Sequence, residues 1–255
     1  MADANEPRRQ RLHGLTVKDG LIRHPFDLEF GVRTSGLVAG RHLAKGLPHG
    51  RHMTAYYAIA PSIFDGILER WRRCQPVAPL DAYTFIDLGA GMGRAVLLAA
   101  THPFRAVAGV ELHPTLARIG RKNMAIWRTA GRARAPMKMY CRDATEFLLP
   151  PGPCVVFLFN PFEAPVMKKL LRHWSRSLAG RQTTVDILYV NNEQNQIVAT
   201  QPGFELLFRG RIHRSPADAA TDRRILDNQP DGEYMALNWE DCSIYRWVGN
   251  GKKKL

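Results

Sequence analysis

The stretch FIDLGAGMGR, residues 85–94, places one acid and three glycines within ten positions, directly after an apolar run. The overlapping run YTFIDLG, residues 83–89, has the apolar character of a buried strand. A glycine-rich turn after a strand lets the backbone approach a ligand where a Cβ would clash, and it opens onto a helix N-terminus. The stretch therefore predicts a strand, a ligand-binding turn and a helix from Gly93 to Ala100.

The glycine spacing narrows the class of ligand. Dinucleotide-binding turns carry G-x-G-x-x-G, with the helix dipole facing a pyrophosphate. Counted from Gly89, the sixth position is Arg94, so the spacing is G-x-G-x-G and the last glycine of that pattern is missing. Asp87 also suits a cation such as an amino group or a sulfonium better than a pyrophosphate. We expect a cationic, nucleotide-like ligand.

Strand-like and helix-like segments alternate from Ala82 to Phe208, which predicts a parallel sheet covered by helices on both faces. The later strands are expected at 106–112, 137–143, 154–162 and 185–192, with helices at 114–128 and from Pro165 to Gly180. Segments 204–212 and 242–248 predict a terminal antiparallel pair, joined by a long polar loop from about His213 to Trp239.

Polar residues follow three of these strands. Glu111 ends the second strand, where a carboxylate can accept both hydroxyls of a ribose. Asp143 follows the third strand, where it can accept the exocyclic amine of an adenine; alternatively, it caps a short helix. Asn160, Pro161 and Phe162 follow the fourth strand and either face the ligand or end the strand and pack against the next helix.

At these residues the sequence resembles the class I S-adenosylmethionine-dependent methyltransferases. DLGAGMGR is similar to their cofactor loop, GVEL at 109–112 to the segment with the ribose-binding acid, and RDA at 142–144 to the adenine-side segment. The resemblance implies an α/β fold with a doubly wound, seven-stranded sheet, mostly parallel with an antiparallel last strand. It also implies S-adenosylmethionine as cofactor and S-adenosylhomocysteine as product. The implied cofactor contacts are Asp87, Gly89, Ala90, Gly91 and Gly93 around the methionine part, Glu111 at the ribose, Asp143 and Ala144 at the adenine, and Asn160.

Asn160-Pro161-Phe162 is similar to the Asp/Asn-Pro-Pro-aromatic element of enzymes that methylate amino nitrogens of bases and of glutamine, but the second proline is missing. The motifs also resemble protein-lysine methyltransferases without a SET domain and uncharacterised bacterial relatives, which share a stretch like YAIAPSIF at 57–64. This resemblance implies N-methylation of an amine, with a protein lysine as the acceptor. The Asn160 side-chain oxygen and the Pro161 carbonyl would then hold the N–H groups, while Phe162 or Tyr57 walls the channel. Catalysis by positioning needs no general base if the amine arrives neutral.

The composition limits partners and location. Among 255 residues, 36 Lys and Arg outweigh 23 Asp and Glu, so the net charge of +13 favours acidic partners and leaves nucleic acid possible. The four cysteines lie far apart and the histidines have no partner at ligand spacing, so we expect neither a disulfide framework nor a metal. No long apolar segment or export signal appears, which predicts a cytoplasmic protein without a membrane partner.

The chain divides into four expected parts. Residues 1–20 form a flexible leader, 21–80 an N-terminal helical cap on the substrate side, 81–249 the cofactor-binding domain, and 250–255 a basic tail. Within the cap, the spacing of Ile63, Ile67 and Trp71 predicts a helix. The oligomeric state is not predicted.

Three alternatives to protein methylation remain. Nucleic-acid N-methylation is favoured by the charge and opposed by the missing proline. An NAD-dependent dehydrogenase is opposed by Arg94 in the glycine position. A non-catalytic, basic nucleic-acid-binding protein on a methyltransferase-like fold is opposed by the complete set of Glu111 and Asp143 behind the glycine loop.

Overall fold

The structure is a computed structural model that describes residues 9–12, 15–18, 23–43, 46–48, 52, 54–181, 183–227 and 237–249. Within the expected leader, β1 (Arg9–Leu12) and β2 (Leu15–Lys18) pair as antiparallel strands. The expected basic tail at 250–255 lies outside the described residues.

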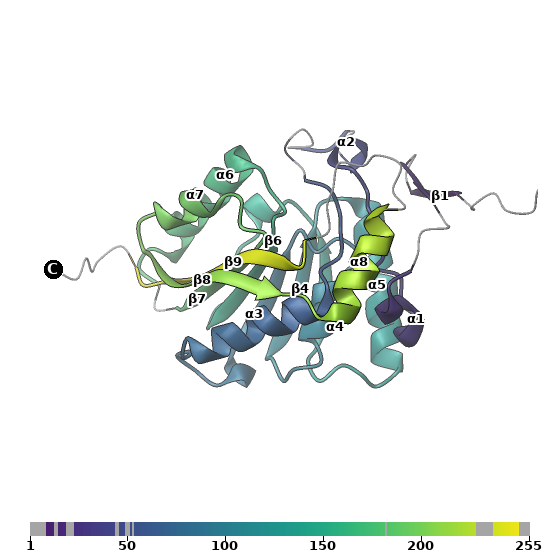
Figure 1. Ribbon diagram of the computed structural model, residues 1–255. Coiled ribbons are helices and arrows are strands. Elements are labelled where there is room, and N and C mark those ends of the chain that lie inside the picture. Colours follow the sequence, from purple (N-terminus) through teal and green to yellow (C-terminus); the bar gives the residue numbers. More distant parts are fainter. Residues whose placement is uncertain are drawn as a thin grey trace, which may run out of the picture.

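The centre of the molecule is a seven-stranded sheet with the order β5-β4-β3-β6-β7-β9-β8 (Figure 1). Its strands are β3 (Thr84–Leu88), β4 (Ala106–Glu111), β5 (Met137–Cys141), β6 (Cys154–Phe159), β7 (Val185–Val190), β8 (Phe204–His213) and β9 (Trp239–Trp247). Strands β3 to β7 run parallel, and β9 lies antiparallel to both β7 and β8. The predicted sheet, including its antiparallel last strand, is confirmed.

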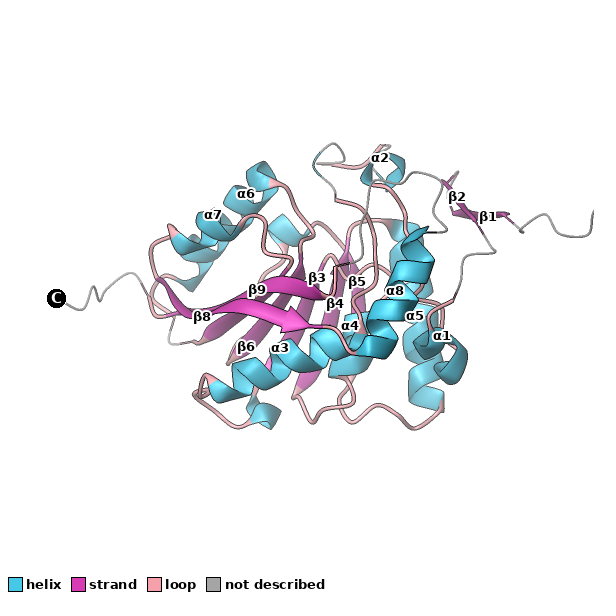
Figure 2. Cartoon of the chain, viewed as in Figure 1, coloured by secondary structure: helices cyan, strands magenta, loops and turns pink. Residues whose placement is uncertain are grey.

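Helices cover both faces of the sheet, because successive strand side chains point to opposite sides. Phe85 and Val155 pack with α3 (Pro61–Arg73), α4 (Arg94–Ala99) and α5 (Pro114–Thr129). Ile86 and Val156 pack with α6 (Ala164–Leu178) and α7 (Asn195–Ala199). Figure 2 shows these two helical layers on either side of the strands. The β3 turn between the layers therefore opens at the carboxyl edge of the sheet.

Short helices and turns complete the fold. Helices α1 (Pro25–Phe30) and α2 (Gly40–Leu43) precede α3, and short 3-10 turns occupy Leu80–Ala82 and Ala144–Glu146. Helix α3, expected within the N-terminal cap, is part of the helical layer, since Ile63, Ile67 and Trp71 are fully buried in the main core.

The expected polar loop from His213 to Trp239 is wrong, because its first half forms α8 (Pro216–Asp227). The pattern hides this helix because its buried side chains are Asp218, Asp222 and one apolar residue, Ile225. Asp222 pairs with the Arg214 guanidinium at 2.9 Å, and Asp218 accepts a hydrogen bond from the Ser62 backbone N–H. Among the described residues, no helix is long and apolar enough to span a bilayer.

Candidate functional site

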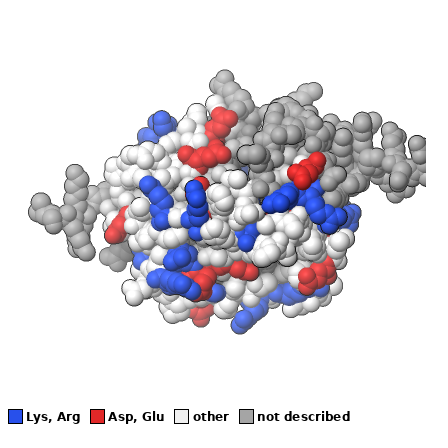
Figure 3. Space-filling model, viewed as in Figure 1, with Lys and Arg blue, Asp and Glu red and all other residues white. Residues whose placement is uncertain are grey.

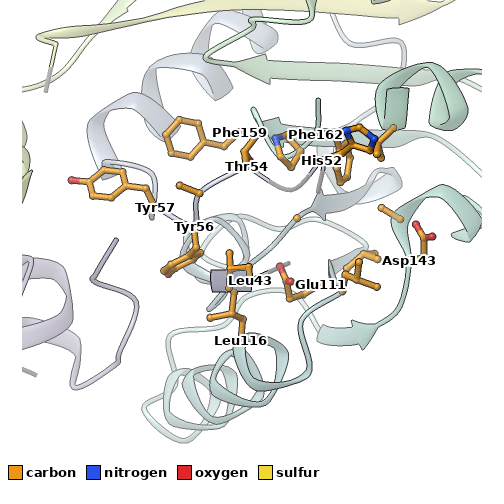
Figure 4. A pocket seen from close by; sticks show the side chains of 17 residues that line it. Leu43, His52, Thr54, Tyr56, Tyr57, Glu111, Leu116, Asp143, Phe159 and Phe162 are labelled. Carbon is orange, nitrogen blue, oxygen red and sulfur yellow. The ribbon is translucent and has the colours of Figure 1, made fainter. Parts of the chain in front are cut away.

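A pocket opens at the carboxyl edge of the sheet, where the turns after β3, β4, β5 and β6 meet the segment before α3 (Figure 4). Its empty volume is about 750 Å³, counting the solvent at its mouth. The predicted residues that line it are Gly89, Glu111, Asp143, Ala144, Pro161, Phe162 and Tyr57. Asp87, Ala90, Gly91, Gly93 and Asn160 are not part of its wall. The structure thus brings the predicted strand-end residues to one cavity.

The turn after β3 needs glycine at two positions because the backbone there is left-handed and closely packed. Gly89 has φ +79°, and a Cβ there would lie 2.5 Å from the Pro161 Cβ. Gly91 has φ +54°, and a Cβ there would lie 2.1 Å from the Tyr56 ring. Any side chain at either position would displace a wall of the pocket or its support.

Glu111 joins this turn to the turn after β4. One carboxylate oxygen accepts the Gly91 N–H at 2.7 Å, and the other accepts the His113 N–H at 2.7 Å. Burial raises the pKa of Glu111 above its usual value, although these backbone N–H groups act in the opposite direction. Each carboxylate oxygen has a second lone pair, which is where a ribose hydroxyl would donate.

Asp87 lies at the buried end of β3, two residues before Gly89. Burial, together with the nearby Glu111 carboxylate, raises the pKa of Asp87 from 3.8 to about 8. The Asp87 carboxyl group is therefore largely protonated at neutral pH in the free protein. A ligand cation brought near it would favour the ionised form.

Asp143 is an N-cap, so the alternative interpretation of this residue is confirmed. Its Oδ1 accepts the Thr145 N–H at 2.8 Å and the Thr145 hydroxyl at 2.7 Å. Lys169 Nζ of α6 lies 3.9 Å from Oδ2. Asp143 also lines the pocket beside Ala144. The cap fixes the carboxylate at the pocket edge, and the adenine contact stays a prediction.

Asn160, in the turn after β6, was expected to face the ligand, but it is not part of the pocket wall. The Asn160 backbone has φ +38°, its carbonyl accepts the Thr54 hydroxyl at 2.7 Å, and its Oδ1 lies 3.4 Å from the Tyr189 hydroxyl. The pocket wall at this turn consists of Pro161 and Phe162. The backbone of Asn160 thus shapes the turn, and a catalytic role of its amide stays a prediction.

Tyr57 lines the pocket, and its hydroxyl donates to Asp222 Oδ1 of α8 at 2.6 Å. Burial and the Asp222 carboxylate raise the pKa of Tyr57 above its ordinary value, so the phenol stays neutral. Arg214 holds Asp222 in turn through a hydrogen bond of 2.9 Å. Tyr57 therefore serves as a fixed ring in the wall, and α8 is the element that fixes it.

Comparisons with solved structures identify the fold. The cyclase SpnF matches with a TM-score of 0.50 at 16% identity over 74% of this chain and 81% of its own. Magnesium protoporphyrin IX methyltransferase from Synechocystis PCC 6803 with bound SAM matches with a TM-score of 0.47 at 10% identity, over 72% and 79% of the two chains. The ribosomal protein L11 methylase from Lactobacillus delbrueckii subsp. bulgaricus matches with a TM-score of 0.41 at 15% identity, over 71% and 75%. Neither a family model nor a curated protein matches the sequence.

The chain has the class I methyltransferase fold. The seven strands of this sheet and its antiparallel last strand, β9, are those expected for it. SpnF is described as a cyclase, so the fold leaves the reaction open.

Arg94, the residue that breaks the dinucleotide pattern, anchors the N-terminal segment to this methyltransferase fold. Its guanidinium is buried and donates to the Thr34 hydroxyl at 2.7 Å and to the Ile59 carbonyl at 3.2 Å. Asp27 lies 3.7 Å away and accepts the Thr34 backbone N–H at 2.7 Å. In the sequence, Arg94 only opposes a dinucleotide ligand, since a buried ion network leaves no periodic signal.

Part of the expected N-terminal cap, residues 21–80, lines the pocket, but apart from Tyr57 its lining residues were not among the predicted site residues. Leu43, His52, Thr54, Ala55 and Tyr56 line the cavity although they precede α3. These residues have no strand or helix periodicity, so only the tertiary fold could place them. Among the described residues, no group of three or more His, Cys, Asp and Glu side chains is arranged to hold a metal.

Proposed function

We propose that the protein is an S-adenosylmethionine-dependent methyltransferase. The observation that carries this proposal is the single pocket in which Gly89, Glu111, Asp143 and Ala144 adjoin the Pro161–Phe162 turn. Carboxylates at the ends of adjacent strands suit the ribose hydroxyls and the adenine amine of the cofactor. When bound, S-adenosylmethionine supplies a methyl group on a sulfonium that a nucleophile can attack.

The chain's residues would orient the cofactor by complementary charge. Glu111 would accept the ribose hydroxyls with the lone pairs that Gly91 and His113 leave available. The Gly89 turn lets the backbone pass close to the cofactor without a Cβ. Asp87, behind this turn, would pair with the ammonium of the methionine part after losing its proton. These contacts fit a cation without a pyrophosphate.

The proposed acceptor is an amine on a protein side chain, a lysine above all. Tyr57, Phe159 and Phe162 contribute aromatic rings to the pocket wall, and the electron-rich faces of such rings would stabilise the positive charge that develops on a neutral amine as it takes the methyl group. Because Tyr57 is held by Asp222, its ring would keep the acceptor in line with the sulfonium. Proximity and orientation of this kind account for a large part of the rate of group transfer. Asn160 and the Pro161 carbonyl remain the proposed partners of the amine N–H groups.

Nucleic-acid methylation is the second candidate, and the charge of +13 is the observation that favours it. On the face of the molecule seen in Figure 3, Lys and Arg side chains are interspersed with Asp and Glu and form no continuous stripe. This arrangement supports a protein acceptor over a phosphate backbone on that face. The proposal places the chain in the cytoplasm, which fits its four free cysteines.

Titration calorimetry with S-adenosylhomocysteine and, separately, with NAD tests the cofactor. We expect binding of the first only, weakened in Glu111→Ala and unchanged in Glu205→Ala, an exposed acid on β8. Binding of NAD alone would support a dehydrogenase instead. Salt-sensitive RNA or DNA binding without either ligand would support the non-catalytic alternative.

Methyl-labelled S-adenosylmethionine, incubated with the protein and fractionated lysate, tests the acceptor. We expect label in protein, at lysine after hydrolysis. Label in RNA or DNA would replace the protein acceptor by the second candidate, and label in small molecules only would exclude both macromolecular acceptors.

A further inference from the structure

A strap formed by His52 and residues 54–57 crosses the pocket, and hydrogen bonds hold it to both sides. The Thr54 hydroxyl donates to the Asn160 carbonyl at 2.7 Å. The Tyr56 backbone exchanges hydrogen bonds of 2.8 and 3.0 Å with Val38, and its hydroxyl donates to the Thr34 carbonyl at 2.6 Å. The strap thus links the turn after β6 to the N-terminal segment that Arg94 anchors.

The His52 end of the strap is fixed by Glu163, the residue that follows Phe162 and serves as the N-cap residue of α6. The imidazole Nδ1 lies 2.8 Å from Glu163 Oε2, and the Glu163 N–H donates to the His52 carbonyl at 3.3 Å. Two contacts to one residue fix both the backbone and the ring of His52. The side chain of His52 is 25% exposed, so one part of the ring is packed while another remains accessible.

This end of the strap lies at the Asp143 end of the pocket. Helix α6, which begins after Glu163, also contributes Val166 to the pocket wall and places Lys169 Nζ 3.9 Å from Asp143 Oδ2. Figure 4 shows His52 on the side of the cavity that faces Asp143, with Tyr57 at the opposite end. His52 thus lies beside Phe162, at the end of the pocket that Asp143 lines, and Tyr57 lies at the other end.

We propose that His52 is a cofactor-binding residue that covers the adenine base, and that Glu163 is a positioning residue that orients the His52 ring. The proposal rests on the proposed function, since it assumes an adenosine ligand with its base at Asp143. A flat imidazole can stack on a base as other aromatic side chains do. With Nδ1 directed to Glu163, the ring would meet the base in one orientation, and the strap would be held closed over it.

Titration calorimetry on the full chain tests this assignment with two ligands, S-adenosylhomocysteine and adenosine. Because stacking on a base contributes substantially to binding, we expect His52→Ala to weaken the binding of both ligands by about tenfold or more. The factor should be the same for the two ligands. His52→Phe keeps a flat ring and should bind within about threefold of the parent. Glu163→Gln retains an oxygen acceptor, so its affinity for both ligands should stay near that of the parent. Glu163→Ala removes the acceptor and should bind both ligands severalfold more weakly.

His102→Ala, in the loop before β4, is the matched control and should change neither affinity. Urea denaturation of each variant checks that the fold is retained. If the parent binds S-adenosylhomocysteine and His52→Ala binds it equally well, the role of His52 is refuted while the proposed function stands. A loss for S-adenosylhomocysteine but not for adenosine would place His52 at the wrong end of the ligand and also overturn it. A parent that binds neither ligand refutes the proposed function itself.

Discussion

The affinity for S-adenosylhomocysteine should rise with pH because Asp87 must lose its proton to pair with the ligand ammonium. Burial and the Glu111 carboxylate raise the pKa of Asp87 to about 8 in the free protein. A bound cation favours the ionised Asp87 carboxylate, so binding below pH 8 releases a proton. Because a higher pH favours the release of this proton, the affinity increases with pH. The ligand keeps its ammonium, which makes it suitable for this measurement.

The size of the effect follows from the ionised fraction. With a pKa of about 8, roughly one Asp87 side chain in a hundred is ionised at pH 6 and half are ionised at pH 8. Because the apparent dissociation constant is the intrinsic one divided by the competent fraction, it should fall about fifty-fold over this range, or about 2.3 kcal/mol. Titration calorimetry at half-unit pH intervals, in buffers of different ionisation enthalpy, measures both the affinity and the released proton.

The unliganded protein should show the opposite trend in stability. The folded-state pKa of Asp87 lies above its ordinary value of 3.8, so its contribution to stability is fully present below that value and is lost as pH rises towards 8. Asp87→Asn mimics the protonated form, so it should remove the pH dependence of binding and leave the weak affinity of the parent at pH 6. A parent whose affinity is constant from pH 6 to 8, or an Asp87→Asn variant with the parental slope, would refute the role of Asp87.

Three further predictions concern the surroundings of Asp87. Gly91→Ala should lower the free energy of unfolding by about 3 kcal/mol in urea denaturation, because it adds a clash with Tyr56 to the cost of a positive φ. Gly131→Ala is the control, because Gly131 also has a positive φ but no heavy atom lies within 4 Å of the added Cβ. This control should show only the smaller backbone cost. Arg94→Ala should cost about 3–5 kcal/mol in the same assay, since it leaves the buried Asp27 carboxylate without its cationic partner, and a loss below about 1 kcal/mol would contradict the anchoring role. Asn160→Ala should leave the affinity for S-adenosylhomocysteine within about twofold while lowering methyl transfer to the labelled lysate fraction; loss of ligand binding instead would move Asn160 to the cofactor side.

The sheet could be predicted from the sequence because its strands carry their own signal. The strand CVVFLF at 154–159 is apolar throughout because both of its faces are covered. Strand β9 has no clear alternation of apolar and polar residues, but it is the last of a regular series of strands and helices. The polar residues at strand ends, Glu111 and Asp143, were likewise predictable, since the carboxyl ends of parallel strands share one edge. What the sequence could not show is the positive φ of Asn160, +38°, and the contact of its Oδ1 with the Tyr189 hydroxyl.

Helix α8 was missed although a local signal for it exists. Ser215-Pro216 followed by Asp218 is a helix start, and the Ser215 hydroxyl does accept the Asp218 N–H at 3.1 Å. Apolar periodicity fails here because the buried face of the helix carries carboxylates, whose partners Arg214 and His24 come from other elements. The helix start at Ser215 does not depend on apolar spacing, so it is a local signal for α8 and for the support that α8 gives to Tyr57.

Arg94 ties the turn after β3 to the N-terminal segment that lines the pocket. A glycine at this position would allow close packing beneath a pyrophosphate. The arginine instead extends beneath the N-terminal segment and donates to the Thr34 hydroxyl. The Thr34 carbonyl in turn accepts a hydrogen bond from the Tyr56 hydroxyl. Tyr56 in turn packs against Gly91 of the same turn. The glycine turn and the strap that covers the pocket are therefore tied together through one buried cation, so a change that loosens the strap should also loosen the turn beneath the cofactor.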